Sequence, residues 1–272
     1  MARMSSRDVP AVDDRPASDH RALRWEGVYN ARDLGGLPTV DGEVTRSRSL
    51  VRSADLRYAT EEALIAMQAH GIGTVLDLRN DFETRLEPKS AEEAQANAHR
   101  VPPTPEPPMP EGVFAVRVPL DNTADRAFWA RMREEGRLGS PRFFRPVIEE
   151  HPRRVVAVLR TIAKAPGGVL YHCAIGRDRT GLTTFALLAL AGVEPEAIVD
   201  DYVRSVEELR PFFARMDFPD PSGWVEENLA KRGFTLEDAL AEQLDGFDAR
   251  AALSRAGLED AELDALVARL RG

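Results

Sequence analysis

Residues 169–181, which read Val-Leu-Tyr-His-Cys-Ala-Ile-Gly-Arg-Asp-Arg-Thr-Gly, constrain the fold of this chain more than any other stretch. The apolar run from Gly168 to Tyr171 follows a Pro-Gly-Gly break, a pattern that predicts a buried strand. The segment from Thr180 to Ala191 has apolar residues on most helical faces and predicts a central, buried helix. The sequence therefore predicts a strand, a short loop and a helix in direct succession, as in α/β folds.

The loop between this strand and this helix has the residues of an anion-binding site. Backbone N–H groups ahead of a helix N-terminus converge on one point, and the helix dipole adds partial positive charge there. Gly176 lets the backbone curl, and Arg179 can donate two parallel hydrogen bonds to phosphate oxygens. Cys173, the only cysteine of the chain, opens the loop, where the positive surroundings favour its thiolate.

A thiolate that faces a bound phosphate is a nucleophile for phosphoryl transfer. We expect the Thr180 hydroxyl to lie near the sulfur and to help it leave in a second step, and His172 to fix the loop through its ring nitrogens. A lone cysteine is more often a small buried hydrophobic residue, and a short motif by itself is only a hypothesis. Here Cys, Gly, Arg and Thr-Gly all fall at the required spacing between a strand and a helix, which favours the catalytic interpretation.

The pattern His172-Cys173-x5-Arg179-Thr180-Gly181 resembles the signature of the cysteine-dependent protein tyrosine phosphatases. Its inner part, residues 176–181, is similar to the Gly-Lys-Asp-Arg-Thr-Gly loop of an atypical bacterial branch, with Arg177 where that branch usually has Lys. Further segments resemble the same branch in order along nearly the whole chain from about Trp25: residues 30–36, 52–56, 75–79 and 201–205.

This resemblance implies an α/β fold of the protein tyrosine phosphatase type, with a central, mostly parallel sheet flanked by helices and a helical cap. It implies hydrolysis of phosphotyrosine monoesters through a phosphocysteine intermediate, with dual specificity that extends to phosphoserine, phosphothreonine or phosphoinositide esters. The implied catalytic residues are Cys173, Arg179 and Asp178. The positions implied to bind the substrate phosphate are Ala174, Ile175, Gly176, Arg177 and Thr180.

Two aspartates compete for the role of general acid, which must protonate the leaving oxygen. Asp178 lies inside the loop beside Arg179, whose charge favours the carboxylate, whereas a bound phosphate dianion favours the neutral acid. Asp121 follows a predicted strand and can swing in on a loop, but its Pro-Leu-Asp-Asn-Thr context also suits an Asx turn. The family resemblance assigns the role to Asp178, and we adopt that assignment.

Charged residues in two other segments are candidates for supporting the loop. Arg32 or Asp33 lies in a segment that is near the active site in the family, although salt bridges within a local turn explain both residues equally well. Asp77 follows a predicted strand, at the end where α/β sheets place ligands. An ion pair between Asp77 and Arg79 that braces the loop is the favoured role.

The rest of the chain is expected to form a tail and one domain. Residues 1–24 are polar and without periodicity, which predicts a disordered tail before a phosphatase domain at 25–272. Aromatic residues between 212 and 247 suit either ordinary helix packing or a lid over the site, placed at 207–247. Strands are expected at 49–53, 73–79 and 113–118, and helices at 60–70, 125–135, 141–149, 155–165 and, as two pieces, 249–270. Residues 81–99 predict two helical pieces, and residues 102–110 an extended, proline-rich loop.

Composition limits which classes of partner and cofactor this chain is expected to bind, and where in the cell it is expected to act. A net charge of −9 over 272 residues, with both signs interspersed, argues against general binding to nucleic acid or membrane surfaces. One cysteine excludes an internal disulfide framework, and the scattered histidines (His20, His70, His99, His151) lack metal-ligand spacing, so we expect no metal and no other cofactor. No apolar run is long enough for stable membrane insertion, and residues 1–20 lack a classical signal peptide. We therefore expect a cytoplasmic protein, with non-classical secretion left open, that acts on a phosphorylated protein or phospholipid.

Two other functions compete with this interpretation. A sulfurtransferase also uses a loop cysteine, but it does not need Arg at the sixth position followed by Thr-Gly. A pseudophosphatase module would bind phosphate without turnover, and would typically lack the cysteine or the arginine, which are both present. Ala174 and Ile175 stand where a phosphoinositide-binding loop would carry a lysine, which favours phosphotyrosine-like esters.

Overall fold

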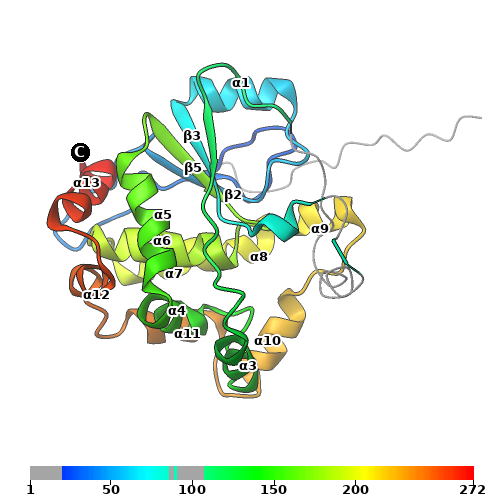
Figure 1. Ribbon diagram of the computed structural model, residues 1–272, viewed down its shortest axis with the longest axis vertical. Helices are drawn as coiled ribbons and strands as arrows, with labels where there is room; N and C mark the ends of the chain where they lie inside the picture. The colour runs from blue at the N-terminus through cyan, green and yellow to red at the C-terminus, as the bar shows by residue number, and fades with distance from the viewer. Residues whose placement is uncertain (1–19, 86–88, 91–106) are drawn as a thin grey trace, which may run out of the picture.

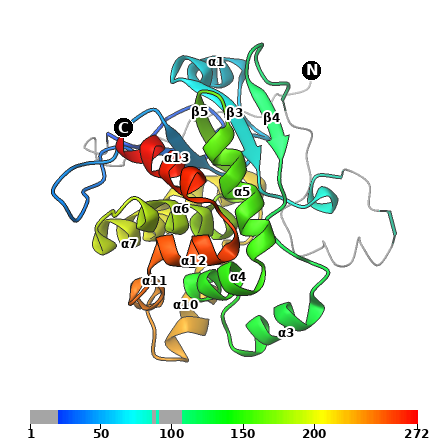
Figure 2. The same cartoon turned by 60° about the vertical axis from the view of Figure 1, so that its left-hand side comes forward.

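The computed structural model describes residues 20–85, 89–90 and 107–272. These residues form an α/β fold around a sheet whose strands lie in the order β1-β2-β5-β3-β4. The strands are β1 (Arg32–Asp33), β2 (Leu50–Ser53), β3 (Ile72–Asp77), β4 (Phe114–Arg117) and β5 (Gly168–His172). β1 pairs antiparallel with β2, and the other pairs are parallel. The expected mostly parallel sheet is confirmed, and Figure 2 shows β4 at its edge.

β5 is the central strand, and all its residues are buried. Its side chains alternate between the two faces of the sheet, as the pleat requires. Leu170 joins one apolar cluster, whereas Val169 and Tyr171 join a larger cluster on the opposite face. The strand register places Ser53 and Asp77 on either side of His172, at the carboxyl ends of three parallel strands. Cys173 therefore leaves the sheet at the edge where α/β folds hold their ligands.

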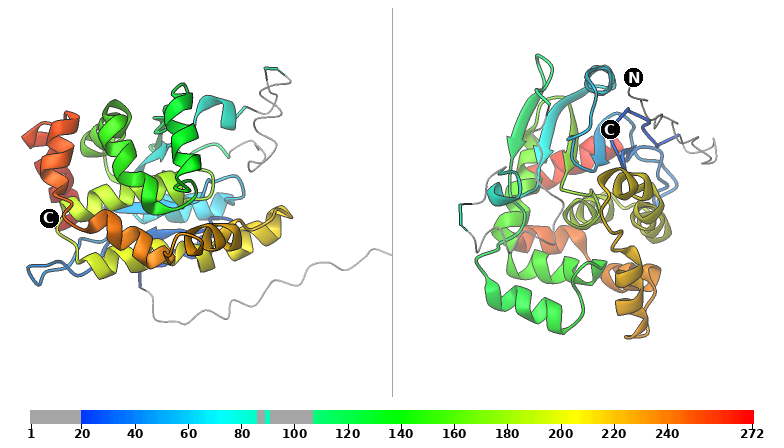
Figure 3. Two further views of the ribbon diagram at one scale, coloured as in Figure 1. Left: turned by 90° about the horizontal axis from the view of Figure 1, so that it is seen from below. Right: turned by 90° about the vertical axis from the view of Figure 1, so that its right-hand side faces the viewer.

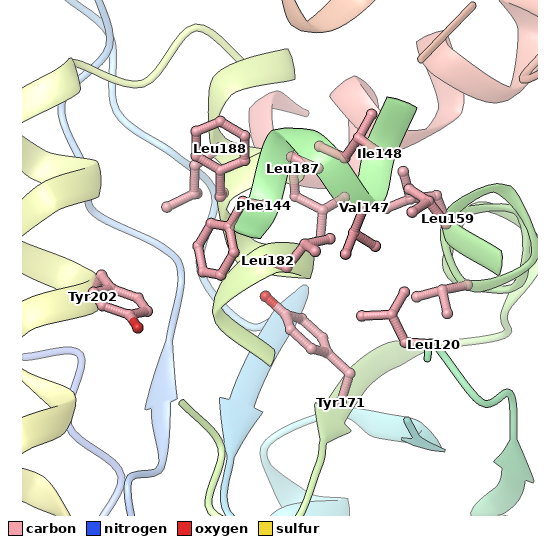
Figure 4. Close-up of a cluster of buried hydrophobic side chains, with 14 of the residues drawn as sticks. Leu120, Phe144, Val147, Ile148, Leu159, Tyr171, Leu182, Leu187, Leu188 and Tyr202 are labelled. Carbon is pink, nitrogen blue, oxygen red and sulfur yellow. The ribbon is translucent and has the colours of Figure 1, made fainter. Parts of the chain in front are cut away.

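Helices cover both faces of the sheet. α1 (Glu61–Ala69) packs on the Leu170 face (Figure 1). α4 (Phe144–Glu150), α5 (Pro152–Lys164) and α6 (Asp178–Leu190) contribute to the cluster on the opposite face. Figure 4 shows Tyr171 of β5 pointing toward Leu182 of α6, and the Tyr171 hydroxyl lies 2.7 Å from Thr184 Oγ1. These contacts fix the strand and the helix on either side of the 173–179 loop.

The remaining helices build the periphery. They are η1 (Asp81–Glu83), α3 (Arg126–Glu134), η2 (Pro141–Phe143), α7 (Pro195–Val203), α8 (Ser205–Glu208), α9 (Arg210–Met216), α10 (Ser222–Ala230), α11 (Leu236–Leu244), α12 (Ala249–Ala256) and α13 (Asp260–Arg271). α3 and α10 project at the end of the molecule opposite to α1 (Figures 1 and 3).

Most expected elements form with small shifts at their ends. Thr60 is the predicted N-cap of α1, and its hydroxyl accepts a hydrogen bond from Ala63 N at 3.2 Å. The helix expected at 141–149 begins as the 3-10 turn η2 and continues as α4. Two helical pieces are expected over residues 81–99. The described residues of this segment, 81–85 and 89–90, form one of them, the 3-10 helix η1, and the other residues of the segment lie outside the described ranges. Residues 102–106 of the proline-rich loop also lie outside them, and residues 107–110 form neither helix nor strand.

Residues 21–24, which the sequence places in the tail, pair with the domain. Leu23 N donates to Ala31 O at 3.0 Å, and Arg21 and Arg24 each lie 2.9 Å from a carboxylate oxygen of α7 or α8. Residues 1–19 of the predicted tail lie outside the described residues. Within the described ranges, no helix is both long and apolar enough to cross a membrane. The same ranges contain no group of three or more His, Cys, Asp or Glu residues that could hold a metal ion.

Candidate active site

Residues 173–177 connect β5 to α6, and the turn requires Gly176. The 173–179 loop consists of this connection and the first two residues of α6. The φ angle of Gly176 is +70°, and a Cβ atom there would lie 2.2 Å from the Ser53 carbonyl oxygen. Only glycine lets the loop pass this close to β2. Cys173 is 2% exposed and contacts the larger apolar cluster. The candidate nucleophile therefore lies at the base of the loop, next to the end of the central strand.

Hydrogen bonds to the carbonyl oxygens order the peptide groups of this loop. All four carbonyl oxygens of residues 173–176 have a partner. Nδ1 of His172 lies 3.1 Å from the Cys173 oxygen, and Asp55 N donates to the Ala174 oxygen at 3.2 Å. Within the described residues, the N–H groups of residues 174–177 donate to no acceptor. Because C=O and N–H of a trans peptide point in opposite directions, these N–H groups face away from the tethers and are available to an anion.

Two carboxylates hold Arg179, the predicted phosphate clamp. Its Nη1 and Nη2 donate to the two Glu83 carboxylate oxygens at 2.6 and 2.8 Å, and its Nε lies 3.6 Å from Asp121 Oδ2. Burial by itself would lower the pKa of Arg179, but the charges of Glu83 and Asp121 raise it well above its ordinary value. Arg179 is therefore a fixed cation beside the loop.

Asp178 and Thr180 contribute polar groups with unused hydrogen-bonding capacity. The Asp178 side chain is 28% exposed, and its Oδ1 lies 3.5 Å from Arg177 Nε. That Oδ1 atom and Thr180 Oγ1 are both buried without a hydrogen-bond partner in the described part of the chain. The two groups expected to act on the reacting atoms are thus available at the N-terminus of α6.

The guanidinium group of Arg177 contacts the start of α10. Arg177 is buried, and its Nη1 lies 3.4 Å from Ser222 Oγ. Burial would lower the pKa of Arg177, but the neighbouring Asp178 raises it. The backbone N–H of Arg177 is one of the four N–H groups described above, whereas its guanidinium group contacts Asp178 and Ser222.

The predicted ion pair between Asp77 and Arg79 is present and connects to the loop. Arg79 Nε donates to Asp77 Oδ1 at 2.9 Å, and Arg79 Nη1 donates to Asp55 at 3.1 Å. Burial raises the pKa of Asp77, but the neighbouring His172 and Arg79 together lower it below the ordinary aspartate value. Burial is the largest influence on the His172 ring and lowers its pKa below the ordinary histidine value. Since Asp55 N–H binds the Ala174 carbonyl, this ion pair braces the loop from the side of β3.

Arg32 and Asp33 have separate roles in the structure. Arg32 Nη1 donates to Asn30 Oδ1 at 2.5 Å, and Asn30 in turn binds the loop. Asp33 instead accepts from Gly35 N and Arg48 N at 2.8 and 2.7 Å, and it lies 2.9 Å from His70 Nε2. Arg32 therefore supports the loop through Asn30, whereas Asp33 joins its own turn to Arg48 and to His70 at the end of α1.

Comparison with known proteins places this arrangement in a family. The profile of a group described as the tyrosine phosphatase family matches residues 23–272. The chain belongs to this tyrosine phosphatase family. The match includes all the residues that form the loop and its supports.

Named relatives agree with this family assignment. A Cupriavidus necator protein, named provisionally as a tyrosine-protein phosphatase, is 31% identical over 67% of this chain, and the match spans 62% of that relative. The triple specificity protein phosphatase PtpB of Mycobacterium tuberculosis is 25% identical over 70% of this chain and 71% of its own length. The crystal structure of P. aeruginosa TpbA covers 78% of this chain and 88% of its own at 15% identity, with a TM-score of 0.36, a likeness too weak to bear on function.

Sequence reasoning missed Asn30, Arg52, Asp55 and Glu83, which contact the loop or Arg179, and Asp201, which anchors Arg52. Asn30, Arg52 and Asp201 lie within the segments that resemble the phosphatase branch, so the resemblance was a signal that their positions mattered. Glu83 had no such signal, because it lies in a charged stretch that predicts surface helix. Its contact with Arg179 spans 96 positions along the chain.

Proposed function

We propose that this protein hydrolyses phosphotyrosine monoesters through a phosphocysteine intermediate. The observation that supports this proposal best is the 173–179 loop. There Cys173 is followed directly by four residues, 174–177, whose N–H groups donate to no acceptor in the described residues, and Arg179 comes two residues later. Membership of the tyrosine phosphatase family supports this reaction class. The Arg at the sixth position after the cysteine, followed by Thr-Gly, favours phosphoryl transfer over a sulfurtransferase.

In the first step, the loop N–H groups and Arg179 bind the phosphate oxygens of the substrate. Cys173 Sγ attacks phosphorus, and the bond between phosphorus and the tyrosyl oxygen breaks as the S–P bond forms. The protonated carboxyl of Asp178 donates its proton to the leaving oxygen, so that tyrosine departs neutral. The products of this step are the free tyrosyl side chain and phosphocysteine.

In the second step, water attacks phosphorus and the S–P bond breaks. The Asp178 carboxylate accepts a proton from the attacking water and is ready for the next cycle. The departing thiolate accepts a hydrogen bond from the Thr180 hydroxyl, which would give the unpartnered Oγ1 its acceptor. Inorganic phosphate then leaves the N–H groups of the loop.

Phosphotyrosine is the favoured substrate because the loop offers few additional cations. Ala174 and Ile175 are uncharged, and the Arg177 guanidinium group is engaged by Asp178 and Ser222. A loop that prefers phosphoinositides would need free cations for the ring phosphates. The M. tuberculosis relative carries triple specificity in its name, and we include phosphoserine, phosphothreonine and phosphoinositide esters as secondary substrates here.

We further propose that part of the segment 207–247 acts as a lid. Ile175 packs against a buried group that includes Phe212 and Phe213 of α9, and Arg177 contacts Ser222 at the start of α10. Other aromatic residues of the segment have ordinary roles, since Phe247 stacks on Phe185 of the main core with ring centroids 4.8 Å apart. The lid proposal therefore rests on α9 and the start of α10.

A substrate panel with two variants tests the proposed reaction. Wild-type protein is expected to hydrolyse a phosphotyrosine peptide faster than a phosphoserine peptide or a soluble phosphoinositide. Cys173→Ser should still bind tungstate but turn over nothing, because the N–H groups remain while the nucleophile is lost. Arg179→Lys should lose most activity, since a point charge cannot replace the bidentate fork. Substantial turnover by Cys173→Ser would remove the covalent mechanism, and tungstate binding without turnover by the wild type would favour a pseudophosphatase.

A further inference from the structure

Three segments without a part in the proposed chemistry meet on the side of the 173–179 loop that carries its carbonyl oxygens. Asn30 and Arg32 come from the N-terminal segment and β1, Arg52 comes from β2, and Asp201 comes from α7. All four residues are at most 2% exposed. Four buried polar residues lie against the proposed anion-binding loop, on the side away from the substrate. Their role is therefore something other than contact with the substrate.

Asn30 binds the loop directly. Its Nδ2 donates to the Ile175 and Gly176 carbonyl oxygens at 3.1 and 3.0 Å. Its Oδ1 accepts from Arg32 Nη1 at 2.5 Å, which fixes the orientation of the amide with its donor toward the loop. One side chain therefore holds two consecutive carbonyl groups.

Asp201 anchors both arginines behind the loop. Its carboxylate accepts from Arg32 Nε at 2.8 Å and from Arg52 Nη1 at 2.7 Å. Arg52 Nη2 donates to the Gly176 carbonyl oxygen at 2.8 Å. Asp201 thus connects to the loop by two chains of hydrogen bonds. One chain passes through Arg52 alone, and the other passes through Arg32 and then Asn30.

The backbone of Asn30 adds a second constraint on the residue type. Its φ angle is +53°, in the left-handed region that glycine adopts freely and that asparagine and aspartate tolerate better than most other residues. Asparagine is therefore the residue that combines this conformation with an amide donor. Glycine would keep the conformation and lose the donor, a difference that an experiment can use.

We propose that Asn30 is a positioning residue, which together with Arg52 holds the Ile175 and Gly176 carbonyl groups outward so that the N–H groups of Gly176 and Arg177 point at the substrate phosphate. If either peptide group flipped by about half a turn, its carbonyl oxygen would replace its N–H group at the anion site. The partial negative charge of that oxygen would repel the anion. The inference rests on the proposed function only for the identity of the substrate, because the geometry concerns binding of any phosphate-like oxyanion.

The test measures tungstate binding by calorimetry in the Cys173→Ser background, where no turnover occurs. Asn30→Asp keeps the size of the side chain but faces the two carbonyl groups with a carboxylate oxygen, so we expect tungstate affinity to fall about tenfold or more. Asn30→Gly keeps the positive φ and removes the donor, and should also weaken binding. This variant keeps the test available if Asn30→Asp does not fold.

Asn228→Asp is the matched control. Asn228 also donates to a backbone carbonyl oxygen, that of Gly136 at 3.0 Å, and accepts from an arginine, Arg232 at 2.7 Å, and it does not contact the loop. We expect it to alter the melting temperature without changing tungstate affinity. If the Asn30 variants melt earlier but bind tungstate like the parent, or if Asn228→Asp weakens binding equally, the positioning role is overturned. A different outcome is that tungstate binding depends on Asn30 as expected, but the protein with Cys173 intact hydrolyses no ester. That result would leave the positioning role intact and remove the proposed function.

Discussion

Glu83 and Asp121 contact different edges of the Arg179 guanidinium group. Glu83 accepts one N–H from each terminal nitrogen, which leaves Nε–H and the second N–H of Nη2 along one edge of the guanidinium group. This remaining edge is the one that can donate two parallel hydrogen bonds to a phosphate. Asp121 lies 3.6 Å from Nε, on that edge. Glu83 therefore orients the clamp, whereas Asp121 lies on the side from which a substrate would bind.

Replacing Glu83 by glutamine tests this division. Glu83→Gln removes the charge that fixes Arg179, so kcat/KM for an aryl phosphate should fall about tenfold or more, given about 1.5–3 kcal/mol for a hydrogen bond to a charged group. Glu242→Gln is the control, because it makes the same change in an ion pair with Arg142, between α11 and η2. A rise in activity on Glu83→Gln would show the opposite, that the carboxylate competes with the phosphate for Arg179.

The choice between Asp178 and Asp121 as general acid is open to a pH–rate test. Asp178 is within the loop at the start of α6, and Asp121 is held near Arg179 Nε. We expect Asp178→Asn to lose the basic limb of the profile and to be slowed most on esters with poor leaving groups, which need protonation. Asp121→Asn should keep that limb. The reverse pattern would transfer the role to Asp121 and leave Asp178 as a residue of the loop only.

Among the secondary-structure elements, α9 packs against the loop that carries Cys173, through its contact with Ile175. Phe212 is fully buried in the group that contacts Ile175, and Cys173 is only 2% exposed. Truncating Phe212 to alanine should loosen α9 and speed the inactivation of the enzyme by peroxide, because oxidation of a thiolate requires access. Mass spectrometry of the Cys173 peptide measures the rate.

Phe247→Ala provides the comparison for α9. It removes a side chain of the same size, but one that stacks on Phe185 of the main core rather than next to Ile175. Both variants should lose stability, on the order of 3–5 kcal/mol for a fully buried phenylalanine and less for the partly buried Phe247. Equal oxidation rates in the two variants would mean that α9 does not shield the thiol, and that its aromatic residues only stabilise the fold.

Over the whole molecule, the sequence predicted what depends on local pattern and missed what depends on long-range contacts. β5, α6 and the Thr60 cap follow from apolar runs and capping residues a few positions apart. The Glu83–Arg179 contact joins residues 96 positions apart, and the Arg32–Asp201 contact joins residues 169 positions apart. The spacing of apolar residues along the sequence does not indicate which distant residues form an ion pair. The resemblance pointed to the segments that contain Arg32 and Asp201, but only the contacts of Asp201 with the arginines of β1 and β2 show that these residues form one buried group.

This buried group also makes the stability of the whole domain depend on pH. Asp201 is fully buried and accepts from Arg21, Arg32 and Arg52. Burial raises the pKa of Asp201, but the three arginines together lower it below its ordinary value. The folded protein therefore keeps this carboxylate charged at pH values where the unfolded chain takes up a proton. The resulting stabilisation is fully present above the unfolded aspartate pKa of about 3.9 and is lost as the pH falls below it.

Asp201→Asn should expose this dependence. At pH 7 the variant leaves three arginines without their carboxylate, and we expect a loss of about 3–5 kcal/mol in the free energy of unfolding. Below about pH 4 the difference from wild type should shrink by up to about 1.4 kcal/mol per pH unit, the effect of one proton taken up on unfolding. Urea denaturation at several pH values from neutral to acid measures both quantities. Asp264→Asn, in an exposed ion pair with Arg250, should change stability little at any pH. A constant difference between Asp201→Asn and wild type across this range would mean that the carboxylate contributes through its shape and hydrogen bonds, and not through its charge.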